Sequence, residues 1–192
     1  MRGMQYLISL ALLVAVGGWI VGVYNRLHHL RSSVCNCWSQ WRKATHYRNE
    51  CLSDFTAAFS AFLPREEPML RHLRHLVADS ERSLSLAPEP RWNSRRGFVA
   101  GAEQLVREAV AQSVRMVEAS PVMNTHEHLL ELCSSVSLSL HRQEQLSTLF
   151  NAAAGEYNAA LGSLSARLLA PVFGFEAADT LDAPMQQARN SD

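Results

Sequence analysis

Residues 7–41 read LISLALLVAVGGWIVGVYNRLHHLRSSVCNCWSQW, an uncharged apolar run that continues into a polar segment with helical spacing. The run itself, residues 7–23, carries no charged side chain, and Tyr6 and Tyr24 stand at its two ends. An apolar helix of about this length crosses the hydrocarbon core of a bilayer, and tyrosine rings favour its boundaries. The sequence therefore predicts a transmembrane helix over residues 7–24.

A cleaved signal peptide is the alternative interpretation of this run, because Arg2 supplies a basic start. The run is too long for that class, and no A-x-A cleavage pattern follows it, so we expect an anchor retained in the lipid bilayer. Arg26, Arg31, Arg42 and Lys43 follow the span, whereas only Arg2 and the amino terminus precede it. Basic residues tend to stay in the cytoplasm, so this asymmetry favours a cytoplasmic domain.

Gly18 and Gly22 form a GxxxG spacing inside the predicted span. This spacing lets two helix backbones approach closely in lipid, and it therefore predicts a homo-oligomer that forms through the transmembrane helix. The alternative is that small residues are simply common in membrane helices.

The segment after the span repeats apolar residues in alternating steps of three and four, which is typical of one helix face. The positions are Leu27, Leu30, Val34, Trp38, Trp41, Leu52, Phe55, Phe59 and Phe62, with Thr45 and Arg48 filling the gap. No glycine or proline interrupts the chain from Tyr24 to Leu63. We predict that the membrane helix continues without a joint into a soluble helix that ends at Pro64.

Three further helices are predicted at residues 66–86, at residues 94–119, and from Asn124 or Thr125 to Leu169. Their apolar stripes are Met69, Leu70, Leu73, Leu76, Val77 and Leu84 in the second helix, Phe98, Ala102, Leu105, Ala109 and Met116 in the third, and Leu129, Cys133, Val136, Leu140, Phe150, Tyr157, Leu161, Leu164 and Leu168 in the fourth. Nothing in the soluble part keeps the period of a strand for long enough to predict a sheet.

The predicted fold is therefore all-α, with an N-terminal transmembrane helix continuous with the long first helix of an antiparallel bundle of about four helices. The expected organisation is a short segment at residues 1–6, the membrane helix at 7–24, the bundle at 25–173 and a loose polar tail at 174–192.

The four cysteines do not predict a disulfide or a metal site. On a helix Cys35 and Cys37 point about 200° apart, and Cys51 lies about 21 Å from Cys37. Cys133 on the fourth helix is the single partner that could meet one of these three thiols. We expect free, partly buried thiols, as is usual in a cytoplasmic domain.

The motifs that carry chemistry are absent from the sequence. His126 and His128 are two residues apart and diverge on a helix, and Glu127, Cys133 and His141 do not restore the i, i+4 arrangement of zinc hydrolases. No GxSxG, phosphate-binding glycine loop or GxGxxG occurs. We therefore expect no catalytic residues, no cofactor and no metal. Lys and Arg equal Asp and Glu at 18 each, so no net positive field attracts nucleic acid.

Five short blocks of the chain form a pattern through their order and spacing. They are Asn36, Trp38 and Ser39 after the span, Arg48 and Glu50 in the first helix, VEASP at 117–121, FNAAAGEYN at 150–158 and LLAPVFGF at 168–175. In these blocks the chain resembles the LemA family of membrane-anchored helical proteins. The chain departs from the family pattern at Gln40-Trp41, at Ser53 and at Ser147-Thr148-Leu149. The resemblance implies a helical, membrane-anchored protein without known catalytic residues.

We therefore expect a non-catalytic scaffold or adaptor that acts through other membrane or membrane-associated proteins. The alternative is a signalling or envelope-stress component that transmits a change along the rod-like helix. The candidate interface or packing residues are Gly18, Gly22, Trp38, Trp41, Arg48, Phe150, Asn151, Tyr157, Asn158, Phe173 and Phe175.

Overall fold

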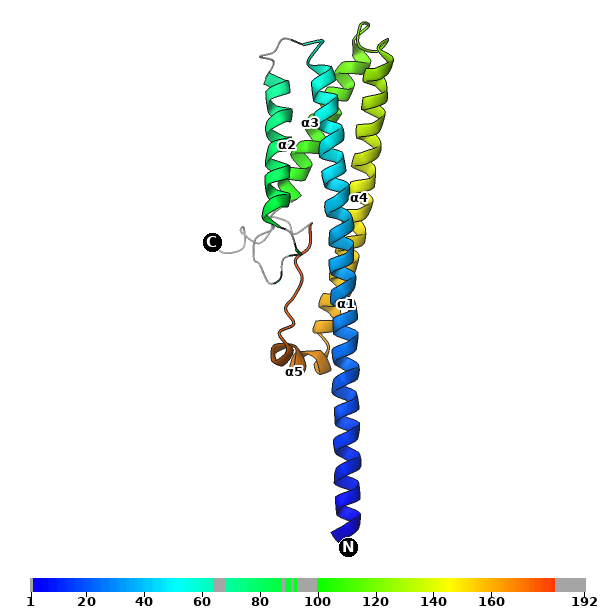
Figure 1. Cartoon of the computed structure of the whole chain (residues 1–192), viewed down its shortest axis with the longest axis vertical. Helices are drawn as coiled ribbons and strands as arrows, with labels where there is room; N and C mark the ends of the chain where they lie inside the picture. Colours follow the sequence, from blue (N-terminus) through cyan, green and yellow to red (C-terminus); the bar gives the residue numbers. More distant parts are fainter. Residues whose placement is uncertain (1, 64–67, 88, 91, 93–99, 182–192) are drawn as a thin grey trace, which may run out of the picture.

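The computed structural model describes residues 2–181, apart from residues 64–67, 88, 91 and 93–99. The described helices are α1 (Arg2–Phe59), α2 (Pro68–Leu86), α3 (Ala100–Ala119), α4 (Glu127–Leu161) and α5 (Leu164–Phe173) (Figure 1). Over these residues no strand occurs, and a single isolated bridge joins Trp92 to Ala178. The predicted all-α class is confirmed.

Helix α1 is one uninterrupted helix of 58 residues, as the sequence predicted. Its N-terminal half projects beyond the other helices as a bare rod, whereas its C-terminal half lies beside α4 (Figure 1). The change comes at Leu27, the first fully buried apolar side chain of α1 in the described part. The long apolar helix from Ser9 onward passes the length and composition test for a membrane span.

The C-terminal end of α1 lies at Phe59, so the prediction that it reaches Pro64 is wrong. Beyond Phe59 the backbone tightens into a turn, in which Ala61 and Phe62 donate to the carbonyl oxygens three residues back, at 3.2 and 3.1 Å. Bonds to the third rather than the fourth residue are typical of a fraying helix end, which needs no proline. The turn keeps Phe62 packed against the end of the helical body.

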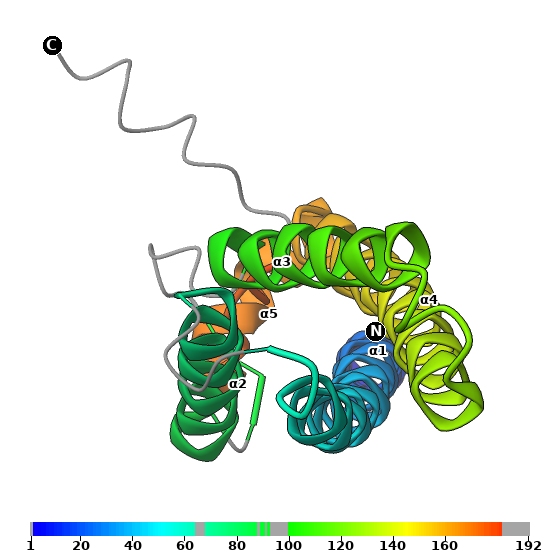
Figure 2. The same cartoon turned by 90° about the horizontal axis from the view of Figure 1, so that it is seen from above.

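The helical body is built around the long interface between α1 and α4, which run in opposite directions. Viewed along the long axis, α1 lies between α2 and α4, and α3 closes the side opposite α1 by reaching from α2 to α4 (Figure 2). Short α5 lies across the end of this body, next to the point where the bare rod begins (Figure 1).

Two apolar clusters fill the body, one above the other. The rod-side cluster contains Leu27, Val34, Trp38, Trp41, Leu84, Phe150, Tyr157, Ala166, Ala170, Phe175 and Leu181. The far cluster contains Leu52, Phe55, Phe59, Leu70, Leu73, Val106, Val110, Val117, Leu129, Cys133 and Val136. The predicted stripes of the first two helices are therefore buried or partly buried against these clusters. Burial of apolar area of this kind supplies most of the folding free energy of a helical protein.

The third helix buries only part of the predicted stripe. Ala109 is buried, and Met116 is partly buried against the far cluster. Leu105, a member of the predicted stripe, is 50% exposed, while Val106, Val110 and Val117 are buried. The true face also carries Glu103, so it looks polar in the sequence. The predicted start at residue 94 and Phe98 lie outside the described residues, as does the side chain of Ala102.

The predicted fourth helix is two helices, so its expected end at Leu169 is wrong. Helix α4 stops at Leu161, and Ser163 begins α5 as an N-cap whose hydroxyl accepts from the Ala166 N–H at 3.4 Å. Glycine is a poor helix former and serine a preferred N-cap, so Gly162-Ser163 favours the break. The new direction leaves Leu164 and Leu168 exposed, against the predicted stripe.

The chain after α5 is also more ordered than predicted. Gly174 takes a left-handed backbone conformation, with φ of 68°, which glycine adopts without the penalty of a Cβ. The chain then turns back along the body, where Phe175, Ala178 and Leu181 are buried. The expected loose tail from residue 174 is therefore wrong for residues 175–181, and residues 182–192 lie outside the described residues.

Candidate functional site

A polar layer separates the two apolar clusters, and it consists of Thr45, Arg48, Asn49, Ser80, Glu103 and Gln143, all buried. Its centre is Arg48, whose side chain is 0% exposed and forms an ion pair with Glu103 of α3. Arg48 Nη2 also donates to Ser80 Oγ on α2 at 2.9 Å and to Asn49 Oδ1 at 2.8 Å. One guanidinium thus joins three helices.

The fourth helix enters the layer through Gln143. Its Nε2 donates to Glu103 Oε2 at 3.0 Å, so Glu103 accepts from α1 and α4 together. Asn49 completes the network by donating to Ser80 Oγ at 3.1 Å and to Glu81 Oε1 at 2.8 Å. A buried ion pair is tolerated when further hydrogen bonds satisfy its remaining atoms, and this network does so.

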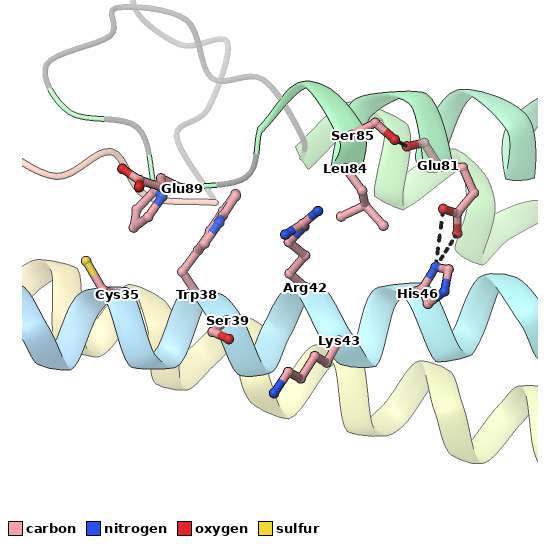
Figure 3. Close-up of a pocket in the computed structure, with 11 residues that line it drawn as sticks. Cys35, Trp38, Ser39, Arg42, Lys43, His46, Glu81, Leu84, Ser85 and Glu89 are labelled. Atoms are coloured by element: carbon pink, nitrogen blue, oxygen red, sulfur yellow. Dashed lines mark hydrogen bonds and ion pairs between the residues drawn. The ribbon is translucent and has the colours of Figure 1, made fainter.

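A groove of about 510 Å³ opens between α1 and α2 on the rod side of this layer. Its α1 wall carries Cys35, Trp38, Arg42 and His46, and its other wall carries Glu81, Leu84, Ser85, Glu89 and Pro90. Figure 3 shows Arg42 pointing from α1 into the groove toward Leu84, while Lys43 points away from α2. The two ends of the groove are acidic, at Glu81 and Glu89, so cation and anions alternate along it.

The groove lacks the arrangement of a nucleophilic site. Burial raises the pKa of the Cys35 thiol, which opposes formation of the reactive thiolate. His46 Nδ1 lies 3.1 Å from Glu81 Oε1, which accepts a hydrogen bond from it. His46 also lies about 16 Å along α1 from Cys35. A thiol and an imidazole this far apart cannot exchange a proton directly. Cys35 and His46 therefore do not form a thiol–imidazole pair in this groove.

The two tryptophans of the first helix are core residues, exposed by 5% for Trp38 and 1% for Trp41. Their rings lie 5.0 Å apart, and Trp38 also packs on Phe150 of α4 at 5.4 Å. The Trp41 indole N–H donates to Ser147 Oγ at 2.9 Å, whereas Trp38 Nε1 is buried without a partner among the described residues. The pair joins α1 to α4 at the base of the body.

Three predicted site residues on α4 hold the segment that follows α5. Asn158 Nδ2 donates to the Ala178 carbonyl, and Asn158 Oδ1 accepts from the Ala178 N–H, both at 2.8 Å. Asn151 Oδ1 accepts from the Leu181 N–H at 2.8 Å. The hydroxyl of Tyr157, a buried residue, donates to the Glu176 carbonyl at 2.9 Å. The FNAAAGEYN block therefore supplies a clamp for backbone.

The remaining predicted site residues lie along the rod and where the rod meets the helical body. A Cβ added at Gly18 or Gly22 would meet nothing within 4 Å, so both faces are open. Phe173 and Phe175 contact Tyr24 of α1, with ring centroids 5.2 and 5.7 Å apart. These contacts bring the end of α5 to the point where the apolar run of α1 stops.

The cysteines and histidines are the side chains of this chain that could bind a transition metal. All four cysteines are free, with Cys51 and Cys133 in the far cluster. In the part of the chain that the structure describes, no three side chains among His, Cys, Asp and Glu converge as a metal site would require. His126 packs its ring edge against Phe62 at 5.1 Å, and His128 lies 3.9 Å from Glu131 on the surface.

Sequence reasoning singled out Arg48 but missed its partners Asn49, Ser80, Glu103 and Gln143. The signal was present, because an arginine in an otherwise apolar stripe predicts a buried charge that needs an acid nearby. Spacing alone could not identify Glu103 as the acid that pairs with Arg48, because the buried face of α3 carries polar residues and does not look like a core face in the sequence. A comparison of the chain with protein-family models, with curated proteins and with solved structures finds no match.

Proposed function

We propose that this chain is a single-pass protein of the bacterial inner membrane, of the LemA type, whose helical body is an antiparallel four-helix bundle. In this proposal the body lies on the cytoplasmic side and acts as a non-catalytic scaffold or adaptor for other membrane or membrane-associated proteins. The family blocks around Trp38, Arg48 and Phe150 support the LemA type, since these residues lie in the core. Trp38 packs on Phe150, and Arg48 is the centre of the polar layer.

The main support for membrane anchoring is the exposed apolar surface of the bare rod. Leu7, Leu10, Leu13, Val14 and Val21 are each more than half exposed on it. In water this continuous apolar surface is unfavourable by roughly 25 cal/mol for each Å² exposed. A bilayer removes the cost, because a helix satisfies its own backbone hydrogen bonds in lipid.

A shallow groove between α1 and α4 supports the scaffold role. It has a volume of about 390 Å³ and is lined by Tyr47 and Leu149, which are 54% and 56% exposed, and by Lys43 and Arg142. Exposed aromatic and aliphatic side chains flanked by arginine are typical of protein interfaces. We propose that an acidic helical segment of a partner binds here, because Lys43 and Arg142 surround the apolar centre with positive charge.

The signalling alternative is supported by the continuity of α1 from the rod to Arg48. A helix without a joint transmits rotation or displacement from lipid to the polar layer, where three other helices are attached. The two roles differ in their prediction: a scaffold binds its partner constitutively, whereas a signalling component changes its binding when the span is perturbed.

The test is affinity purification of the full chain from gently solubilised membranes, with variants of the α1–α4 groove. A specific co-purifying protein that is lost with Tyr47→Ala and Leu149→Ala supports the adaptor role. Leu105→Ala is the matched control, since Leu105 is a half-exposed leucine on α3 outside this groove. Partner binding that persists in the groove variants contradicts the assignment of this surface.

A reporter fused after Asp192 tests the orientation, and periplasmic activity would overturn the cytoplasmic placement.

A further inference from the structure

Helix α5 lies where the bare rod meets the helical body (Figure 1). Phe173 at its end contacts Tyr24, with ring centroids 5.2 Å apart. Tyr24 is also the residue at which the apolar run of α1 stops. Helix α5 therefore lies at the level along α1 where the proposed span leaves the bilayer.

Helix α5 has two apolar faces, of which the protein covers one. Ala166 and Ala170 are 1% and 7% exposed and belong to the rod-side cluster. Leu164, Leu168 and Val172 are 83%, 72% and 76% exposed. Residues four apart on a helix are offset by about 40°, so these three form one stripe, and it lies opposite the two alanines.

This exposed stripe looks away from the rod-side cluster, because the alanine face is turned toward that cluster. Apolar side chains are also exposed on α1 on the N-terminal side of Tyr24, where Trp19 and Val21 are 48% and 56% exposed. Arg167 in α5 is exposed as well, one residue before Leu168. An arginine at such a position extends its charged end to lipid phosphate while its methylene groups cover apolar surface.

We propose that α5 is an interfacial helix that lies in the surface of the phospholipid bilayer, with Leu164, Leu168 and Val172 inserted among the outer ends of the acyl chains. This proposal rests on the proposed anchoring of α1, because the same bilayer must surround the rod. Lipid fits this stripe better than a protein partner does, because Phe173 places α5 against Tyr24, the residue at which the proposed span ends. The effect is a second attachment that holds the helical body against the membrane.

The test uses the purified full chain in vesicles of phosphatidylethanolamine and phosphatidylglycerol. The photo-crosslinker p-benzoylphenylalanine replaces one residue at a time, and mass spectrometry measures lipid adducts after irradiation. Leu168 is the test position, and Leu138 on α4 is the matched control, because it is an equally exposed leucine, at 71%, beside Val136 of the far cluster. Trp19 in the rod reports on the span. All three side chains are exposed, so the fold should tolerate each replacement.

The expected result is strong lipid labelling at positions 19 and 168 and several-fold weaker labelling at position 138. Labelling at position 168 that only equals position 138, with strong labelling at 19, overturns the interfacial helix and leaves the anchor intact. Lack of lipid labelling at position 19 overturns the proposed anchoring and the inference with it. Protein–protein adducts at position 168 in place of lipid adducts overturn the inference by showing that a second copy covers the stripe.

Discussion

Arg48 of α1 and Glu103 of α3 form an ion pair in the centre of the helical body, with Arg48 fully shielded from solvent and the Glu103 side chain 10% exposed. Moving two charges out of water costs several kcal/mol for each ion, so the pair depends on its neighbours for compensation. Ser80 and Gln143 supply that compensation from α2 and α4. The pair therefore fixes how the four helices are aligned along one another.

Removing one partner of this pair should destabilise the protein strongly. Arg48→Met leaves the Glu103 carboxylate buried without its counter-charge, and we expect a loss of about 3–5 kcal/mol in the free energy of unfolding. The measurement is thermal unfolding of the full chain in detergent, followed by circular dichroism. The double variant Arg48→Met with Glu103→Leu removes both charges and should recover most of the loss. A single variant that melts like the unmodified protein would contradict the burial of the pair.

The two adjacent tryptophans should respond differently to the same substitution. Trp41→Phe removes the hydrogen bond to Ser147 and should cost about 1 kcal/mol more than the loss of packing alone. Trp38→Phe instead removes a buried N–H that has no partner among the described residues, which relieves an unpaired polar group. Chemical denaturation should therefore rank Trp41→Phe as the less stable variant. Equal stabilities would mean that the indole nitrogen of Trp38 is hydrogen-bonded in solution.

The first helix shows how much of the fold could be predicted from the sequence. Its steps of three and four identified a buried stripe from Leu27 to Phe59, and even the polar members Thr45 and Arg48 are buried as the spacing requires. Periodicity succeeds here because a long helix packs one face along its whole length. The same rule succeeded only in part in α3, where Ala109 of the predicted stripe is buried but Leu105 is exposed, and Glu103 is buried instead. Glu103 can be buried because it pairs with Arg48 of another helix. A periodicity rule that is applied to one helix at a time cannot identify such a partner.

The α4–α5 break and the ordered residues 175–181 were missed for a related reason. Gly162-Ser163 is a local signal for a helix end, but glycine inside helices is also tolerated at a cost of about 1 kcal/mol. Residues 175–181 read FEAADTL, a short stretch of mixed polar and apolar residues outside any predicted helix, so their pattern did not predict burial. Its order comes from Asn151, Tyr157 and Asn158, which lie on another helix. Those three residues were correctly selected as candidates, but through the family resemblance and without a structural role.

The open faces at Gly18 and Gly22 allow a test of dimerisation through the span. Replacing both with Ile should abolish chemical crosslinking of two copies in membranes, because the branched side chains prevent close approach of the backbones. The fold of one copy should be unaffected, since a Cβ at either position meets nothing within 4 Å. Gly17→Ile is the matched control, because Gly17 has the same free space but faces about 100° away from Gly18. A dimer that persists in the double variant would exclude this face.

The buried phenol of Tyr157 should make stability fall at alkaline pH. Burial raises the pKa of Tyr157 above its ordinary value of 10.0, so the folded protein favours the neutral phenol. A group whose pKa is raised by folding contributes stability fully below the unfolded pKa and loses it as pH rises through the folded pKa.

Tyr157→Phe loses the bond to Glu176, about 1 kcal/mol, at neutral pH. Its melting temperature should approach that of the unmodified protein as pH rises above about 10. A constant difference between pH 8 and 11 would contradict the burial of the phenol. Cys133, whose pKa burial also raises, is common to both proteins and cancels in the comparison, whereas a charged Cys35 adds to the rise in the pKa of Tyr157.

The Asn158 clamp makes a prediction about local rather than global stability. Its amide forms two bonds of 2.8 Å to the Ala178 backbone, one as donor and one as acceptor, which only Asn or a similar amide provides. Asn158→Asp keeps the acceptor but loses the donor and places a carboxylate against the Ala178 carbonyl, so it should weaken the clamp more than its small change in size implies. Hydrogen exchange of residues 175–181 should accelerate, while exchange in the far cluster, for example at Leu129 and Val136, should stay unchanged. Asn36→Asp is the matched control, because it makes the same change at an exposed asparagine of α1. Slow exchange of residues 175–181 in Asn158→Asp would show that the burial of Phe175 and Leu181, rather than the clamp, holds this segment against the body.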